Sequence, residues 1–253
     1  MRRTLHSWSA ASLPSSVRVV RVWGVRVIGL LAVLNLLLGV LQYVGAIDTS
    51  VEGSWYSLID INEEQNVPTW FSTLLLAGAS LAAAGVAQLQ RRRGARTYRW
   101  WGALAALYGF ASLDEMASLH ERLIVPVREA FDLSGALYSA WVVPGLIVIA
   151  VLTGVFWRFS RSLPGHLKWR FGLGAVLFFG GAVGFEMVGA AAFSRLGAGP
   201  LSGAMAVAEE TLEMLGALLW LETMLVGLDL ELKPVPVAAR GTGARALASG
   251  SGR

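Results

Sequence analysis

Six long apolar stretches constrain the fold of this chain more than any other feature of its sequence. They lie near residues 25–46, 69–90, 100–121, 137–158, 171–192 and 204–228. Each is close to the roughly 20 residues that an α-helix needs to cross a bilayer. Since 55% of the 253 residues are hydrophobic and only 15% are charged, the sequence predicts an all-α, polytopic membrane bundle of six transmembrane helices with the lipid bilayer as its partner.

The basic residues predict how these helices are oriented. Arginine and lysine gather before the first stretch, between the second and third, between the fourth and fifth, and after the sixth. On the other side are Arg122, Arg128 and Arg195. Because cytoplasmic links carry the excess of Lys and Arg, we expect both termini in the cytoplasm. The same clustering argues against nucleic-acid binding, to which the net charge of +4 would otherwise point.

The chain is expected to have three parts. We expect residues 1–24 to form a basic cytoplasmic N-terminus and residues 25–229 to form the transmembrane domain. Residues 230–253 are rich in Gly, Ala, Ser and Pro and lack apolar periodicity, which is typical of a disordered cytoplasmic tail. The absence of cysteine excludes both disulfides and thiolate metal sites.

Acidic residues within the apolar stretches are the main functional candidates. Ionisable groups in a membrane are costly, so they usually face the bundle interior and mark function. With the expected orientation and about 1.5 Å of rise per residue, the acids of the third, fifth and sixth stretches fall at one depth, in the outer half of the membrane. These residues are Asp114, Glu115, Glu121, Glu186, Glu209, Glu210 and Glu213, with His120 beside them. The loop before the second stretch adds Asp60, Glu63, Glu64 and Asn66.

Helical spacing predicts which of these acids are neighbours. Asp114 and Glu121 are seven residues apart, which places them on one face of the third helix. Glu213 follows Glu209 by four residues and Glu210 by three, so these acids are neighbours on the sixth helix. Like charges at this spacing repel unless a cation lies among them. The pattern therefore predicts a polar core that binds a cation.

The donor set indicates which cation is expected. Iron or manganese suits several carboxylates with one imidazole better than zinc, which prefers more nitrogen or sulfur; calcium or magnesium would accept the same oxygens. The expected ligands are Asp114, Glu115, His120, Glu186, Glu210 and Glu213. Glu121 or Glu209 would act as the acid/base on a substrate. The Glu-x-x-His spacing of soluble di-iron bundles is absent, because Ala117 stands three residues before His120.

Several of these residues also fit a purely structural role. Glu121 fits equally well as a solvated residue paired with Arg122 or Arg128. An isolated histidine at this depth is more often a hydrogen-bonded interfacial residue than a ligand, and at least two of the loop acids are expected to be solvated. Glu186 stands alone among small residues that favour close helix packing, so we expect it to point inward.

Three segments together resemble a known group of proteins. They are INEEQNVPTWFSTLLL, SLDEMASLHERL and AEETLEMLGALLWL. Their combination is similar to a widespread family of six-span bacterial integral membrane proteins of unknown function, over the second to sixth stretches. The resemblance implies the bacterial cytoplasmic (inner) membrane and brings no activity with it.

Three functions are compatible with these patterns. The first is a membrane metalloprotein, and in its fullest form a metalloenzyme, acting on a lipid-soluble or periplasmic substrate. The second is a cation- or proton-coupled transporter, in which the buried acids carry the ion; Glu222 is its only candidate acid in the inner half, so no continuous polar path is visible. The third is a non-catalytic membrane subunit or sensor whose acids form packed, hydrogen-bonded pairs.

Overall fold

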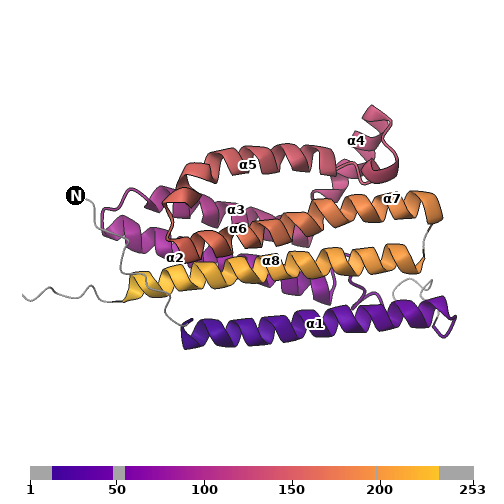
Figure 1. The fold of residues 1–253 in the computed structure, drawn as a ribbon, viewed down its shortest axis with the longest axis horizontal. Coiled ribbons are helices and arrows are strands. Elements are labelled where there is room, and N and C mark those ends of the chain that lie inside the picture. The colour runs from indigo at the N-terminus through magenta and orange to yellow at the C-terminus, as the bar shows by residue number, and fades with distance from the viewer. Residues whose placement is uncertain (1–12, 48–54, 198, 234–253) are drawn as a thin grey trace, which may run out of the picture.

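The computed structural model describes residues 13–47, 55–197 and 199–233, and within them the chain is helical, with no strand. The long helices run side by side along the longest axis of the molecule (Figure 1). The helices are α1 (Ser15–Tyr43), α2 (Val67–Arg92), α3 (Tyr98–Ala117), α4 (Ile124–Phe131), α5 (Val142–Ser162), α6 (Gly165–Phe179), α7 (Glu186–Leu196) and α8 (Pro200–Leu232). Single turns are η2 (Glu121–Leu123), η3 (Gly135–Leu137) and the π-helical η4 (Gly180–Phe185). The expected features of residues 1–12 and 234–253 lie outside the described residues.

Five helices are long and apolar enough to cross a membrane, which indicates a multi-pass membrane protein. They are α1, α2, α5, the continuous helix from Gly165 to Leu196, and α8. The prediction of six spans is therefore not confirmed. The sixth candidate, α3, forms a helix of 20 residues, but Arg99, Asp114 and Glu115 lower its hydropathy.

Helix α8 is the centre of the bundle. It packs against α1, α2, α6, η4 and α7, and 56% of its most apolar window is buried, against 17% for α5. Figure 1 shows α1 beside α8 and α5 on the opposite side of the molecule. The main core lies between α2, α3 and α8, where Leu76, Leu104 and Met214 are fully buried. The outward apolar faces of α1 and α5 are suited to contact with lipid.

The two ends of the bundle carry opposite charge. The end that we call the basic end holds the start of α1, the α2–α3 and α5–α6 links, and the end of α8 (Figure 1). Arg93 and Lys233 are among the residues that form ion pairs there. The other end, the acidic end, holds the loop before α2, the end of α3, and the α7–α8 turn. The expected functional acids lie at this second end.

Helix α3 ends earlier than the sequence predicted. Ser118 adopts a left-handed conformation with φ of 48°, and its N–H bonds to the carbonyl oxygen of Asp114, which stops the helix at Ala117. His120 and Glu121 consequently leave the helix axis, and Glu121 begins the turn η2. The prediction that Asp114 and Glu121 share one face of a continuous third helix is therefore wrong.

Candidate functional site

Asp114, in the last turn of α3, holds His120 at two points. One carboxylate oxygen accepts a hydrogen bond from the main-chain N–H of His120 at 3.0 Å, and the other lies 2.9 Å from its Nδ1. The imidazole also packs on the ring of Trp141, with 4.7 Å between centroids. Since Nδ1 is engaged, Nε2 is the ring nitrogen left to bind a ligand or exchange a proton.

The protonation of His120 depends on these neighbours. Burial alone would lower the pKa of the imidazole, because it disfavours the charged form. The hydrogen bond and charge of Asp114, together with the charges of Glu121 and Glu115, outweigh burial and raise the pKa above its usual value. His120 is therefore tuned toward the imidazolium form by the acids around it.

The loop before α2 is ordered by Asn66, which caps that helix. Its side-chain oxygen accepts from the N–H of Thr69 at 3.1 Å, an ordinary N-cap interaction. Its amide nitrogen donates to the carbonyl oxygens of Glu63 at 2.7 Å and Ser57 at 3.2 Å. The loop is thereby fixed against the start of α2, with Glu64 on its inner side.

Glu64 joins the acids of the bundle, although it is not among the ligands expected from the sequence. Thr69 donates its hydroxyl to the carboxylate of Glu64 at 3.3 Å. Burial raises the pKa of Glu64, and the charge of Glu121 adds to this effect. One sequence feature could have indicated this position of Glu64, namely the helix start at Asn66. Residues just before an N-cap lie over the first turn of the helix.

Acids from four segments lie within range of one another's charge. Glu115 on α3 interacts with Glu64, Asp114 and His120. Glu210 on α8 interacts with Glu115 and Glu64, and also with the acids of α7 and η2. Glu213, one turn further along α8, interacts with Glu210, Glu209, Glu115 and Glu186. Glu115, Glu210 and Glu213 are each half-buried.

Glu186 and Glu209 form the contact between α7 and α8. Both carboxyl groups line the same cavity, and each lies within range of the other's charge. Glu186 stands directly after the π-helical turn η4, a type of insertion that is frequent at functional sites. Gly181 in that turn lets α8 approach closely, because a Cβ there would lie 2.7 Å from the main-chain oxygen of Glu209.

A metal-ligand set is not formed by the side chains as they stand. Within the described parts of the chain, no three His, Asp or Glu side chains are arranged to hold a metal ion. The expected ligands and the two expected acid/base residues lie at the same end of the bundle, but their assignment stays a prediction. Glu121 is exposed on η2, while Glu209 is half-buried at the α7 contact.

The buried acid at the basic end is neutralised by arginine. Glu222 of α8 is 2% exposed and pairs with Arg21 of α1, at 3.0 Å from its Nε, and with Arg170 of α6. In the described residues, the ion pairs with Lys or Arg all go to Glu222, Asp229 and Glu231, at the basic end. The acids of the acidic end have no such partner there.

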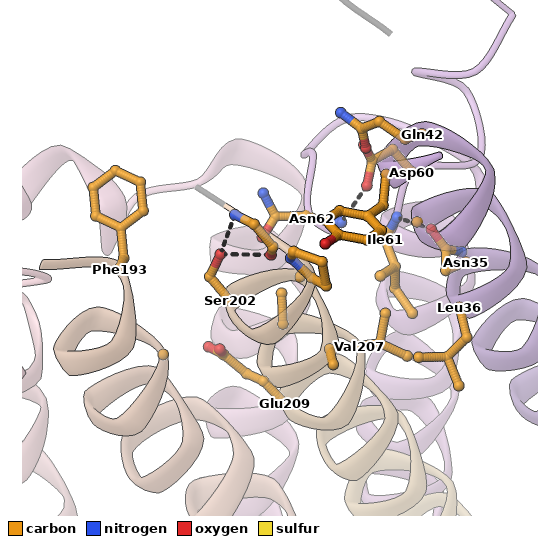
Figure 2. A pocket seen from close by; sticks show the side chains of 18 of the residues that line it. Asn35, Leu36, Gln42, Asp60, Ile61, Asn62, Phe193, Ser202, Val207 and Glu209 are labelled. Atoms are coloured by element: carbon orange, nitrogen blue, oxygen red, sulfur yellow. Dashed lines mark hydrogen bonds between the residues drawn. The ribbon is translucent and has the colours of Figure 1, made fainter. Parts of the chain in front are cut away.

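A cavity of about 810 Å³ lies beside these acids, between α1, the loop before α2, α7 and the start of α8. Glu186 and Glu209 line it. Figure 2 shows Glu209 and Phe193 on one side of the cavity and Asn35, Leu36 and Asp60 on the other. Asn35 fixes the loop at this wall, since its side chain accepts from the N–H of Ile61 at 2.9 Å.

The helices and their internal acids define a multi-pass helical membrane protein with ionisable groups inside the bundle. The chain belongs to the family described as a domain of unknown function (DUF8692), which matches residues 27–226. The match confirms the resemblance to an uncharacterised family and extends it over most of α1. Neither a curated protein nor a solved structure matches the chain.

Proposed function

We propose that this protein binds a divalent cation among the acids of its acidic end and works as a membrane metalloprotein. The observation that supports this proposal is a contrast between the two ends. Glu222 at the basic end has two arginines, whereas the interacting acids Glu115, Glu210 and Glu213 have no Lys or Arg partner in the described chain. A cation would supply the missing positive charge.

The repulsion between like charges is large compared with the stability of a folded domain. Two like unit charges 4 Å apart repel by about 4 kcal/mol at an effective dielectric constant of 20. A whole domain is stable by only about 5–15 kcal/mol. Uncompensated repulsion among several buried acids would therefore offset much of the stability of the fold, so protons on these acids or a bound cation would stabilise it.

The proposed ligands are the six residues expected from the sequence: Asp114, Glu115, His120, Glu186, Glu210 and Glu213. Binding requires the flexible glutamates to rotate toward one another, while Asp114 already orients His120. Oxygen-rich sets with one imidazole favour iron or manganese before zinc, calcium or magnesium. Of the two acid/base candidates, Glu209 is the better placed, because it lines the cavity through which a lipid-soluble substrate would enter.

The proposed location is the bacterial cytoplasmic membrane, with the acidic end toward the periplasm or the outer leaflet. The support is the arginine content of the α2–α3 and α5–α6 links, since such links prefer the cytoplasmic side.

Metal analysis of the purified full chain tests the proposal. Wild-type protein, exposed to iron, manganese, zinc and calcium and then desalted, should retain about one or two equivalents of one metal. Glu115→Gln and Glu213→Gln should lose it, whereas Glu231→Gln, which alters an acid at the basic end, should not. Metal-free wild-type protein, or equal loading of all variants, would overturn the proposal.

A proton-coupled carrier is the second candidate, and one observation favours it. As the described side chains stand, no three acids or histidines could hold a metal, so protons could relieve the repulsion instead. The prediction is a pH-dependent flux in liposomes that Glu115→Gln and Glu213→Gln abolish while the protein stays folded. A folded, metal-free protein without any flux would leave the third function, a non-catalytic subunit.

A further inference from the structure

The cavity between α1, α7 and α8 has a lining of unusual charge. It contains the acids Asp60, Glu186 and Glu209, and no Lys, Arg or His lines it among the described residues. Four aromatic rings also line it: Tyr43, Tyr56, Tyr138 and Phe193. Acids and aromatic faces both attract cations. Arg128 already lies over the ring of Tyr138, 4.2 Å from its centroid, so the three acids and the other three rings are the groups that select for positive charge.

The remaining lining combines small and apolar residues with the polar side chains of Asn35, Gln42, Asn62, Ser139 and Ser202. Leu36, Val40 and Val207 supply branched side chains, and α7 and α8 supply mainly glycine and alanine. The volume of about 810 Å³ falls in the range of roughly 300–1,000 Å³ that is typical of small-molecule sites. The cavity can therefore hold a hydrocarbon body beside a charged group.

We propose that this cavity binds a lipophilic amine, with its ammonium group between Glu186 and Glu209 and its hydrocarbon chain against the small residues of α7 and α8. Both carboxyl groups line the cavity, one from each of the two helices. Asp60 is less suited to this role, because it already accepts a hydrogen bond from the N–H of Asn62 at 3.0 Å.

This inference deepens the proposed function, since Glu186 and Glu209 belong to both, and it names the substrate class. The two proposals fail separately. Amine binding is measured on chelator-treated protein, and metal content is measured without amine. If metal-free protein binds the amine, only the amine site is supported. If the protein binds metal but no amine, only the amine site is overturned.

The experiment uses the full chain in nanodiscs of phosphatidylcholine, with decylamine as probe and decanol as its neutral match. Wild-type protein should bind decylamine saturably, above the linear uptake of empty nanodiscs, and about tenfold or more tightly than decanol, because charged hydrogen bonds form in a buried site. Glu209→Gln and Glu186→Gln should each lower the affinity for decylamine about tenfold. Equal binding of decylamine and decanol would overturn the proposal.

A second pair of variants keeps the test independent of the carboxylates. Gly39 lines the cavity, and a Cβ there meets nothing within 4 Å, so Gly39→Leu would add its side chain to the cavity wall from an open position. Gly29 on the same helix is equally open but does not line the cavity. Gly39→Leu should abolish saturable decylamine binding and Gly29→Leu should preserve it. Unchanged binding by Gly39→Leu would show that the amine lies elsewhere.

Discussion

The two carboxylate oxygens of Asp114 reach the main-chain nitrogen and the Nδ1 of His120, at 3.0 and 2.9 Å. The first bond closes the turn that ends α3, and the second orients the imidazole. A single side chain thus fixes both the path of the backbone and the direction of the one histidine at the acidic end. His120 is consequently held in place before any ligand binds.

Replacing Asp114 should change the titration of His120. In Asp114→Asn the hydrogen bond to a charged acceptor is lost, and burial then lowers the pKa of His120. The histidine signals in NMR spectra, assigned with His120→Gln, would report this fall. Glu129→Gln, an exposed change on α4, is the control. A pKa of His120 that is the same in Asp114→Asn and wild type would contradict the role of Asp114.

The same pair should make thermal stability depend on pH. Because the folded pKa of His120 is raised, its contribution is fully present below the unfolded value of about 6.5 and is lost as pH rises through the folded value. The unfolding midpoint of wild type should thus fall relative to Asp114→Asn as pH increases across that window. Parallel midpoint curves for the two proteins would count against the linkage.

The close approach of α8 at Gly181 predicts that alanine substitutions at two neighbouring glycines will differ clearly in their effect on stability. A Cβ at Gly181 would lie 2.7 Å from the main-chain oxygen of Glu209 and 2.9 Å from Cγ of Glu213, whereas one at Gly184 meets nothing within 4 Å. Gly181→Ala should destabilise the protein by about 1–3 kcal/mol through overpacking, as measured by unfolding in detergent. Gly184→Ala is the matched control, and equal stability of the two variants would refute the close contact.

The two arginines that pair with Glu222 at the basic end predict a large loss of folding stability when this acid is removed. Glu222→Gln leaves the largely buried Arg170 and the more exposed Arg21 without their counter-charge, which should cost about 3–5 kcal/mol. Lys233→Ala breaks the exposed pair with Asp229 and should cost less than about 1 kcal/mol. Unfolding midpoints of the two variants are to be compared; similar values would mean that Glu222 is not the anchor of α1, α6 and α8.

The loop wall of the cavity depends on Asn35. Its side chain bonds Ile61 N–H and the carbonyl oxygens of Ile59 and Leu31 at 2.9–3.0 Å. Asn35→Ala should leave these groups unpaired, at about 1–3 kcal/mol, and speed amide exchange between residues 55 and 66. Asn62→Ala, at an exposed position of the same loop, should leave exchange unchanged. Protection of the loop in Asn35→Ala would show that other contacts fix it.

The sequence predicted the helices well where length and hydropathy act alone. The long apolar runs became α1, α2, α5 and α8, because a helix satisfies every backbone group inside a bilayer. The end of α3 could not be predicted, since Ser118 has no special preference for a left-handed conformation, and the turn depends on the contact of Asp114 with His120. The π-helical turn η4 was equally hidden, because its residues read as an ordinary apolar helix.

The sequence predicted that the acids lie at one end of the bundle, but it did not predict which way each side chain points. Counting the rise along each helix placed the acids of α3, α7 and α8 at one end, where their charges do interact. Glu64 was missed as a member because a loop residue has no helical periodicity to indicate which way it points. The pairing of Glu222 with Arg21 and Arg170 could not be predicted, because the sequence does not show which side chains on separate helices face one another.

The turn η4 has a consequence for how Glu186 is aimed. A π-helical turn accommodates one more residue than an α-helical path over the same length, and each residue advances the helix by about 100°. Removing a single residue between Gly180 and Phe185 would restore a regular helix and swing everything after it around the axis by about that angle. The meeting of Glu186 with Glu209 therefore depends on a count of residues, and relatives that lack this insertion would carry the same glutamate without the same partner.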